Sequence, residues 1–472
     1  MDYTKVIGAF PEATINKTTT GNTLANFLDL PADVKFWLLQ KFTDERGVLQ
    51  AFELSEYVKN YRLKPNEWNI RLLEAAHTAK GEIKLLTKVV VEFDYANDLI
   101  CFSLPEYGFP KKKGEGQLDW SVISRSKHHL LNPDGAWGEA TLCYDCGMVK
   151  LVEFIPLCPY TFDLRTYQSG RERFDTDEWI DVLIAGLNFN PDAMDKDAKL
   201  TLLQRFLPFV EKRLNQIELA IKGSGKSYCY SQLSTHNWLT SGTVSRATAF
   251  YHNTTKKVGY FGHYDNVIWD EVQTLKCTNA EEMNGVLKPY LESGEIRIGS
   301  YCGTADAGLT LVGNIPIGQM DFEKHNMFTS LPKMFKESAF LDRFSGIIEG
   351  WKIGRFTEDR KFEGWGLSAN YLTGMFHELR DEFYYRAIVD DLLIVEGNCD
   401  TRNFEAIKKS CTAYLKLLFP HIKDISEVDI EQFREYCLNP AIRMRWAVLC
   451  QLRFLDEEYE DVKMPKIKIK GE

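Results

Sequence analysis

A glycine-rich turn between an apolar segment and an expected helix constrains the fold of this chain more than any other feature. Residues 216–227 read QIELAIKGSGKS, so Gly223, Gly225, Lys226 and Ser227 directly follow an apolar strand. This is the P-loop pattern, in which backbone N–H groups and the positive end of the next helix hold phosphate oxygens. The sequence therefore predicts an α/β fold with a nucleotide phosphate site.

Each residue of this turn has an expected role. The phosphate cradle is formed by Gly223, Ser224, Gly225, Lys226 and Ser227. Lys226 is expected to reach the β- and γ-phosphates of ATP, and Ser227 to hold Mg²⁺. The pattern GxxxxGK[ST] begins with a glycine where this chain has Ala220. A chance GSGKS turn therefore remains an alternative, and so does a DNA-binding scaffold that has lost ATP hydrolysis.

Two further apolar segments end in polar side chains. Residues 266–271 read NVIWDE, and residues 309–314 read LTLVGN. Asp270 is expected to order the Mg²⁺ shell, and Glu271 to orient the attacking water. Asn314 stands where AAA+ ATPases carry sensor 1, which contacts the γ-phosphate or the water. The alternative for each segment is a buried strand that ends in a solvated turn.

A fourth motif, FLDRF at 340–344, places Arg343 after the other three in the chain. This order indicates an arginine finger, which supplies positive charge to the transition state from a neighbouring subunit. A lone arginine is more often a surface charge, so the prediction depends on the order of the motifs. Together the four motifs predict an AAA+ P-loop NTPase core.

An insertion separates Asp270 from the sensor 1 strand. A helix at 283–294 precedes residues 295–308, EIRIGSYCGTADAG, which are predicted to form a β-hairpin with Gly303 near its tip. Such an insertion is typical of the AAA+ clade that includes the MCM helicases, whose hairpin contacts DNA in the pore of a ring. Lys288 and Arg297 are the cationic candidates for this contact. The alternative is an ordinary surface hairpin.

Composition sets the class of protein. The chain has 472 residues, 44% of them hydrophobic and 26% charged, with a net charge of −10. These values exclude a disordered or collagen-like chain. We expect neither a membrane span nor a secretory signal, because no apolar stretch of about 18 residues and no basic-then-apolar N-terminus are present. The acidic balance still permits a local basic channel for DNA.

Cysteine usage favours a cytoplasmic protein. Eleven cysteines are scattered along the chain, an odd number. Cys143 and Cys146 form one Cys-x-x-Cys pair, with Cys158 and 128–129 (His-His) nearby. A zinc ribbon usually needs a second pair. We therefore expect a plain β-hairpin that carries two thiols, with a zinc site as the alternative.

The chain is expected to contain an N-terminal α+β domain, the AAA+ core and a C-terminal helical lid. The expected bounds are 1–135 for the N-terminal domain, 136–200 for a lead-in region, 201–355 for the core, and 356–472 for the lid and C-terminal region. Helical spacing predicts helices at 33–42, 67–78, 175–187, 200–213 and 402–418. Strands at 83–92 and 98–104 are expected to pair across 95–97, which suits a winged-helix-like module. The basic tail at 463–470 is expected to be frayed or strand-like.

A basic cluster lies in the N-terminal domain. It comprises Lys111, Lys112, Lys113, Arg125 and Lys127. Together they are a candidate surface for DNA outside the pore. The alternative is a solvated loop, which is the usual setting of a run of charges.

Several segments together resemble one family. They are GAWGEATL (135–142), VEFIPLCPYTFDL (152–164), EWIDVLIAGLNFNP (178–191), RFLPFVEKRLNQIELAIKGSGKSYCY (205–230), VIWDEV (267–272), LVGNI (311–315), FLDRFSGIIEGW (340–351) and RNFEAIKKSCTAYLKLLFP (402–420). Over roughly 130–420 the chain resembles the BrxL family, the Lon-related AAA+ proteins of BREX phage-defence systems.

The resemblance implies an MCM-like ring ATPase that binds ATP, Mg²⁺ and DNA and acts with other BREX components against phage. The expected assembly is a homo-oligomeric ring, a hexamer or a related ring, and stacking of two rings stays open. Longer members carry a Lon-like protease domain with a Ser–Lys dyad. Too few residues follow Pro420 for such a domain, so protease activity is not expected.

The resemblance also implies a sensor 2 arginine. Arg402 matches the arginine that opens the lid helix, and Arg380 is the runner-up. Both have the alternative of a helix-surface charge. A rival function is a protein unfoldase or chaperone-like ring, in which the residues around Tyr301 would form an aromatic pore loop.

Overall fold

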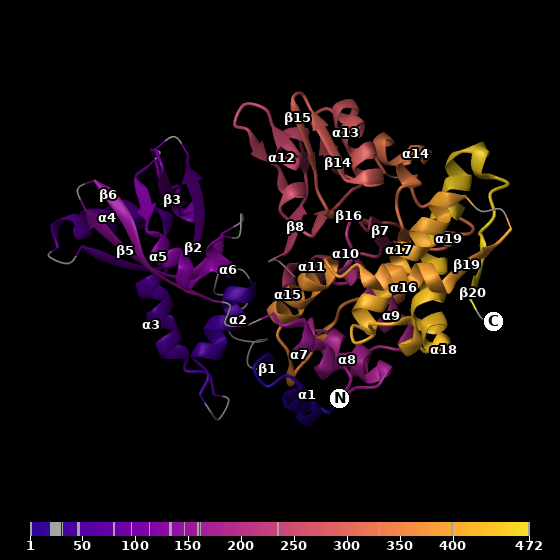
Figure 1. Cartoon of the computed structure of the whole chain (residues 1–472), viewed down its shortest axis with the longest axis horizontal. Helices are drawn as coiled ribbons and strands as arrows, with labels where there is room; N and C mark the ends of the chain where they lie inside the picture. The colour runs from indigo at the N-terminus through magenta and orange to yellow at the C-terminus, as the bar shows by residue number, and fades with distance from the viewer. Residues whose placement is uncertain are drawn as a thin grey trace. The chain divides into compact units, whose positions relative to one another are not determined.

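The structure is a computed structural model that divides into two compact units (Figure 1). It describes residues 2–18, 30, 32–44, 48–78, 81–95, 97–112, 114–131, 135–145, 147–157, 160, 162–233, 236–329, 331–397 and 400–470. The barrel unit is Asn22–Tyr160, and the sheet unit is Met1–Gly21 together with Thr161–Glu472. No helix within the described ranges is long and apolar enough to cross a membrane.

Five strands of the barrel unit close on themselves. They are β2 (Glu82–Asp94), β3 (Leu99–Ser103), β4 (Gly116–Leu118), β5 (Ala136–Asp145) and β6 (Met148–Pro156), in the order β2-β3-β4-β6-β5. β4 and β6 pair in parallel, and the other described pairs are antiparallel. Helices α5 (Trp120–Arg125) and α6 (Lys127–Leu130) connect β4 to β5. This topology is that of an OB-fold barrel.

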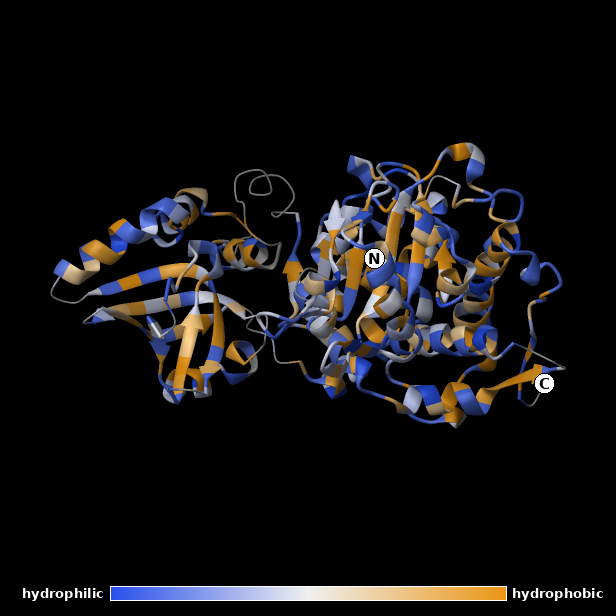
Figure 2. Cartoon of the chain, turned by 90° about the horizontal axis from the view of Figure 1, so that it is seen from above, coloured by the Kyte–Doolittle hydropathy of each residue, from blue (hydrophilic) through white to orange (hydrophobic). Residues whose placement is uncertain are grey.

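Alternating side chains form the barrel core. At the start of β2, Ile83 and Leu85 are buried, whereas Glu82 and Lys84 are exposed. Phe102, Leu142 and Leu151 from the other strands join the same core. Helices α2 (Ala32–Lys41), α3 (Ala51–Tyr61) and α4 (Trp68–His77) precede the barrel in the chain. In Figure 2 the strands of this unit accordingly carry both orange and blue residues.

The barrel confirms some local predictions and corrects the module. The helix at 67–78 and the hairpin across 95–97 are present, with Asp94 opposite Leu99. The winged-helix expectation is wrong, because β5 pairs with β2 from Val89↔Ala136 to Glu82↔Cys143. Residues 136–156, expected in a lead-in region, therefore complete the barrel. This pairing joins segments that are distant in the chain, so the spacing of apolar residues within each segment could not predict it.

The cysteine and basic clusters are described in part. Cys143 lies in β5 with a free thiol. Cys146, Cys158 and the side chain of His128 lie outside the described residues, so the two plain thiols of the expected hairpin stay a prediction and zinc binding its untested alternative. Lys113 also lies outside them. The other four basic residues of the cluster are exposed, namely Lys111, Lys112, Arg125 and Lys127.

A five-stranded parallel sheet organises the sheet unit. The strands are β7 (Gln216–Ala220), β8 (Asn237–Thr240), β12 (Asn266–Trp269), β16 (Gly308–Asn314) and β17 (Gly346–Ile348), in the order β17-β7-β16-β12-β8. All four neighbouring pairs are parallel. β7, β12 and β17 are buried along their whole length, as expected of a sheet covered on both faces. The carboxyl ends of β7, β12 and β16 share one edge.

The helices of the sheet unit form largely where they were predicted. α8 (Thr176–Gly186) begins at a capping box in which Asp175 and Glu178 bond each other's backbone N–H. α17 (Thr401–Leu418) matches its predicted bounds closely. The single helix expected at 200–213 is instead α9 (Lys196–Leu203), a short 3₁₀ turn and α10 (Leu207–Val210). Pro208 explains the break, because its ring excludes a continuous helical hydrogen-bond ladder.

Strands interrupt the expected helical C-terminal region. Helices α15 (Ala369–Arg380), α16 (Tyr384–Leu392), α18 (Ile430–Phe433) and α19 (Asn439–Leu455) follow β17, with β18 (Trp365–Leu367), β19 (Leu393–Glu396) and β20 (Lys466–Ile469) among them. β20 pairs antiparallel with β19, so the basic tail is strand-like. The spacing of apolar residues within either segment could not predict this pairing, because the two strands are distant in the chain.

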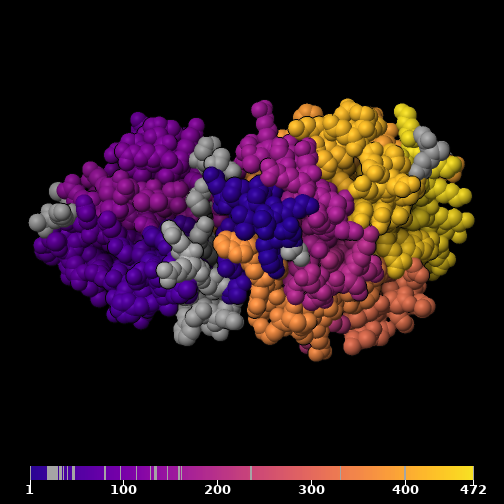
Figure 3. All heavy atoms as spheres, turned by 90° about the horizontal axis from the view of Figure 1, so that it is seen from below, coloured from indigo at the N-terminus to yellow at the C-terminus, as the bar shows by residue number. Residues whose placement is uncertain are grey.

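The first residues belong to the sheet unit, not to the barrel unit. α1 (Tyr3–Ala9) precedes β1 (Thr14–Asn16), which pairs antiparallel with β18. Lys17 is buried, and its Nζ donates to the carbonyls of Ala185 and Gly186 at the end of α8, at 2.9 and 2.6 Å. Figure 3 shows this indigo segment lying on the magenta and orange surface of the same unit.

Candidate nucleotide site

Four predicted residues from three strand ends meet at the carboxyl edge of the sheet. Lys226 Nζ donates to Asn314 Oδ1 at 3.0 Å and to the Ile221 carbonyl at 2.9 Å. Ser227 Oγ donates to Asp270 Oδ2 at 2.8 Å. Burial lowers the pKa of Lys226 from its usual value. The parallel sheet thus brings together motifs that lie far apart in the sequence.

The glycines of the turn have the backbone freedom that the pattern demands. Gly223 and Gly225 have φ of 77° and 71°, in the left-handed region that favours glycine. A Cβ at Gly223 would meet nothing within 4 Å, so this side of the turn is open. Gly225 directly precedes α11 (Lys226–Gln232). An open turn of this kind, with an ammonium group beside it, fits phosphate oxygens.

Ala220 fits its place without strain. It is fully buried as the last residue of β7 and is not among the residues with positive φ. Its carbonyl accepts the N–H of Ile315 at 3.1 Å, which ties β7 to the end of β16. Position 220 is therefore ordinary strand backbone, and alanine there does not distort the turn.

Glu271 has a strained backbone directly after Asp270. Its φ of 50° is in the left-handed region, which is costly for a residue with a Cβ. The N–H of Glu271 donates to Asp270 Oδ1 at 2.8 Å. The exposed Glu271 thus has a fixed backbone at the edge that carries Lys226 and Ser227. Such strain is typical of functional sites.

The two predicted arginines meet at a single glutamate. Arg343 Nε lies 2.9 Å from Glu292 Oε2, and Arg402 Nη2 lies 3.1 Å from the same oxygen. Arg343 Nε is buried, and its N–H has no acceptor in line. Arg402 also contacts Asp342 Oδ2 at 3.0 Å. We call Arg343 and Arg402 the arginine pair.

A buried framework holds the arginine pair in place. Asp342 is 4% exposed, and it also pairs with Arg445, whose guanidinium is fully buried. Arg445 Nη1 donates to the carbonyl of Phe344 at 2.7 Å, and its Nε to Asn403 Oδ1 at 2.7 Å. The segment around Arg343 is therefore anchored to α17 and α19.

Arg380, the alternative sensor 2 residue, lies at the other edge of the sheet. It is 5% exposed, so the surface-charge alternative is wrong for this residue. Its Nε lies 3.2 Å from Asp265 Oδ1, and Asp265 directly precedes β12. The amino edge of a parallel sheet is opposite the P-loop edge, which disfavours Arg380 as a contact to this chain's own nucleotide.

The predicted hairpin is present with a different tip. β14 (Glu295–Ile298) pairs with β15 (Tyr301–Thr304), and the turn falls at 299–300. Gly303, expected near the tip, lies opposite Ile296 instead. Arg297 is on β14, exposed, with its Nε 2.6 Å from Glu295 Oε1. Tyr301 stacks on Tyr251 with ring centroids 4.0 Å apart.

Lys288 is not part of the hairpin. It lies on α13 (Ala280–Ser293), where its ammonium pairs with Glu337. Contact between Lys288 and DNA therefore stays a prediction, and within this chain its charge is paired with Glu337. The spacing of residues along the helix could not reveal the ion pair of Lys288, because Glu337 comes from a segment beyond the sensor 1 strand.

Sequence reasoning missed a buried ion pair beneath the turn. Arg205 and Glu218 are fully buried, with Nη2–Oε1 at 2.6 Å and Nε–Oε2 at 2.9 Å. Arg205 Nη2 also donates to the Ser224 carbonyl at 3.2 Å. The available signal was Glu218 itself, a charge inside the apolar strand QIELA, since buried charges need partners.

Comparison with known proteins places this geometry in a family. Residues 149–465 match the family model described as "Lon-like protease BrxL-like, ATPase domain". The chain belongs to the BrxL family. A second BrxL model, "BREX system Lon protease-like protein BrxL N-terminal", matches residues 8–144. The P-loop, Asp270, Asn314 and the arginine pair all fall within the range of the ATPase domain.

Two curated BrxL relatives match the chain in part. The "Lon-like protease BrxL" of Bacillus cereus (strain H3081.97) is 31% identical over 293 residues, covering 61% of this chain and 43% of the relative. The "Lon-like protease BrxL" of Escherichia coli O9:H4 (strain HS) is 27% identical over 397 residues, covering 82% and 55%. The chain thus spans about half the length of the curated relatives it matches.

Proposed function

We propose that this chain is an AAA+ ATPase that forms a ring, binds DNA and uses ATP hydrolysis to translocate on it or remodel it in BREX-type phage defence. The observation that carries the proposal is the grouping of Lys226, Ser227, Asp270 and Asn314 at one sheet edge. The order of the strands across the sheet also supports it. If the five strands are numbered as they occur in the chain, they lie side by side in the order 5-1-4-3-2, which is the arrangement of AAA+ cores.

The P-loop edge supplies what phosphoryl transfer needs. Lys226 would hold phosphate charge, and Asn314 would contact the γ-phosphate or the attacking water. The Ser227 hydroxyl and the Asp270 carboxylate are oxygen ligands of the kind that Mg²⁺ prefers. When bound, Mg²⁺ neutralises charge on the phosphates. Glu271 would orient the water, since it directly follows Asp270 at the end of β12.

The arginine pair would act on the nucleotide of a neighbouring subunit. Within this chain its described partners are Glu292, Asp342 and the Ala339 carbonyl, none of which belongs to the P-loop edge. The buried N–H of Arg343 lacks an in-line acceptor, which a γ-phosphate oxygen would provide. Supply of an arginine in trans implies a closed ring, a hexamer or a related assembly.

Glu292 links the arginine pair to the hairpin. It lies in the last turn of α13, and β14 begins at Glu295 after the left-handed cap Gly294. If a neighbour's phosphate draws the arginines away, Glu292 loses both partners at once. A change in the nucleotide bound at the ATP site would thus alter the contacts of Glu292, which lies only three residues before the hairpin. Arg297 would then contact DNA phosphates in the pore.

The barrel unit supplies a second surface for DNA. OB-fold barrels bind oligonucleotides, and bases stack on their exposed aromatic side chains. Tyr95 is 88% exposed at the β2–β3 turn, and its ring meets that of Phe93 edge-on with centroids 4.8 Å apart. Lys111 and Lys112 are exposed on the segment between β3 and β4. Other BREX components are the expected protein partners.

Mixed rings test the shared ATP site. Lys226→Ala and Arg343→Ala should each abolish ATP turnover, and Arg343→Ala should keep nucleotide binding. Mixing the two inactive variants should restore part of the turnover, because some interfaces then combine an intact P-loop with an intact arginine. Mixed assemblies without any turnover would refute the placement of Arg343 in trans, and an active Lys226→Ala chain would refute the ATP site itself.

Salt dependence of DNA binding tests the substrate. Phosphate contacts release counterions, so DNA affinity should fall steeply between about 50 and 200 mM salt. Arg297→Gln should make the plot of log affinity against log salt concentration less steep by about one phosphate contact. Lys288→Gln should leave this slope unchanged. A protein-unfolding ring would instead show DNA binding that is weak and insensitive to Arg297.

A further inference from the structure

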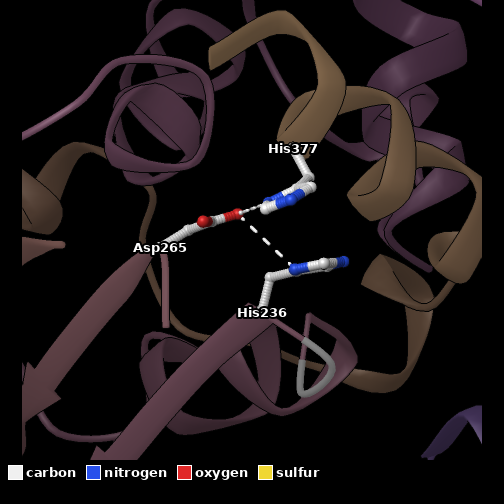
Figure 4. A group of neighbouring side chains, drawn as sticks. All are labelled: His236, Asp265 and His377. Carbon is white, nitrogen blue, oxygen red and sulfur yellow. Dashed lines mark hydrogen bonds and ion pairs between the residues drawn. The ribbon is translucent and has the colours of Figure 1, made fainter. Parts of the chain in front are cut away.

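Two histidines and an aspartate meet at the amino edge of the sheet, away from the P-loop. His236 directly precedes β8, Asp265 directly precedes β12, and His377 lies on α15. Figure 4 shows the two imidazole rings stacked beside the Asp265 carboxylate. Their centroids are 4.4 Å apart, at an interplanar angle of 19°. None of the motifs of the ATP site includes these residues.

The nitrogen and oxygen atoms have the spacing of a metal's ligands. Asp265 Oδ2 lies 2.8 Å from His377 Nδ1 and 3.6 Å from His236 Nδ1. One ligand atom from each of the three residues falls within 4.8 Å of the others. In tetrahedral zinc sites, bonds of about 2.0–2.1 Å separate neighbouring ligand atoms by about 3.3 Å. The two distances from Asp265 lie on either side of that value, so binding would require the two imidazole nitrogens to converge on the ion with Asp265 Oδ2.

Surrounding groups orient the carboxylate. Arg380 Nε lies 3.2 Å from Asp265 Oδ1, which leaves Oδ2 to face the histidines. The Asp265 N–H donates to the His236 carbonyl at 3.0 Å, so two ligand-bearing segments are tied together before any metal binds. Such outer contacts are typical of metal sites. The Arg380 charge weakens attraction for hard cations, whereas imidazole nitrogens favour zinc and its neighbours.

We propose that His236, Asp265 and His377 bind one transition-metal ion of the zinc class, with the fourth position open to water. His377 is 46% exposed at its side chain and provides the route of entry. The site would join the starts of β8 and β12 to α15. Because it lies opposite the P-loop edge, its role would be to fix α15 on the sheet, and it is independent of the proposed ATP hydrolysis.

Metal titration of the full chain tests this site. After chelation and dialysis, the chain should bind one Zn²⁺, and Co²⁺ should give the visible absorption of a tetrahedral site without a thiolate band in the near ultraviolet. His377→Ala should weaken Zn²⁺ binding at least 100-fold, while His325→Ala, a change at an exposed histidine elsewhere in the sheet unit, should not alter it. His377 is half exposed, so its replacement should leave the fold intact.

Three outcomes would overturn the site. One is the absence of stoichiometric Zn²⁺ binding to the folded chain, which would leave the cluster as an ion-pair network around Asp265. Another is equal Zn²⁺ affinity in His377→Ala and the parent chain. The third is a thiolate band with Co²⁺, which would assign the metal to cysteines. None of these outcomes bears on Lys226→Ala, so the site and the ATP proposal fail separately.

Discussion

Removal of one partner of the Arg205–Glu218 pair should destabilise the sheet unit strongly. Both side chains are fully buried and joined by two contacts, at 2.6 and 2.9 Å. Glu218→Gln keeps the shape but leaves the guanidinium charge uncompensated, which costs about 3–5 kcal/mol. At about 1.4 kcal/mol per tenfold change, the unfolding equilibrium shifts by about two to four powers of ten.

The double variant separates charge from packing. Arg205→Met with Glu218→Leu removes both charges and their desolvation, so it should cost far less than Glu218→Gln alone. It should still lose the bond from Arg205 to the Ser224 carbonyl, worth about 1 kcal/mol, and loosen the P-loop. Nucleotide affinity should therefore drop in the double variant, although stability recovers.

Hydrogen exchange of the β7 amides in the full chain measures the effect, because the two units need not unfold together. Glu358→Gln is the matched control, since Glu358 pairs with Lys361 at 84% exposure and should contribute less than about 0.5 kcal/mol. A loss below about 1 kcal/mol for Glu218→Gln, or equal losses for the single and double variants, would refute the reasoning.

Three further predictions follow from single observations. Glu292→Gln removes the charge shared by the arginine pair. If Glu292 links the ATP site to the hairpin, DNA should stimulate ATP turnover in the parent chain but not in the variant, while nucleotide binding stays; equal stimulation of both chains in a turnover assay would contradict the link. Phe93→Ala with Tyr95→Ala should weaken binding of single-stranded DNA by about 1–3 kcal/mol per stacked base in fluorescence anisotropy, and Tyr3→Ala, in the sheet unit, should not. The free energy of unfolding should fall as the pH drops from 6.5 towards 4, because burial lowers the pKa of His421 to about 4 and the unfolded chain takes up that proton first; a His421→Leu chain with an unchanged slope in acid titration would count against this.

Local chemistry explains why much of the candidate nucleotide site was predictable. Lys226 and Asp270 follow apolar strands and Asn314 ends one, and parallel strands that share an orientation bring such residues to one edge. The helices at 175–187 and 402–418 were likewise predictable, because caps and apolar spacing are properties of neighbouring residues. Pro208 also indicated a break in the helix predicted at 200–213, but the prediction gave more weight to the helical spacing of its apolar residues.

Other features depend on partners that no local pattern reveals. The closure of β5 onto β2 turns the first part of the expected lead-in region into two of the five barrel strands. Lys288 has its charge matched by Glu337, and Arg380 is buried beside Asp265, although both have the spacing of exposed helix residues. Each case is decided by a contact between segments that are distant in the chain.

The P-loop turn by itself predicted a phosphate site, because backbone N–H groups, glycine freedom and a lysine act within a few residues. The sequence also determined the order of the motifs and hence the edge at which they meet. Only the tertiary structure decided that Arg343 and Arg402 share Glu292, that Arg205 supports the turn through Glu218, and that two histidines converge on Asp265. The physical reason is that charge pairing acts through space, and the fold alone sets which charges are neighbours.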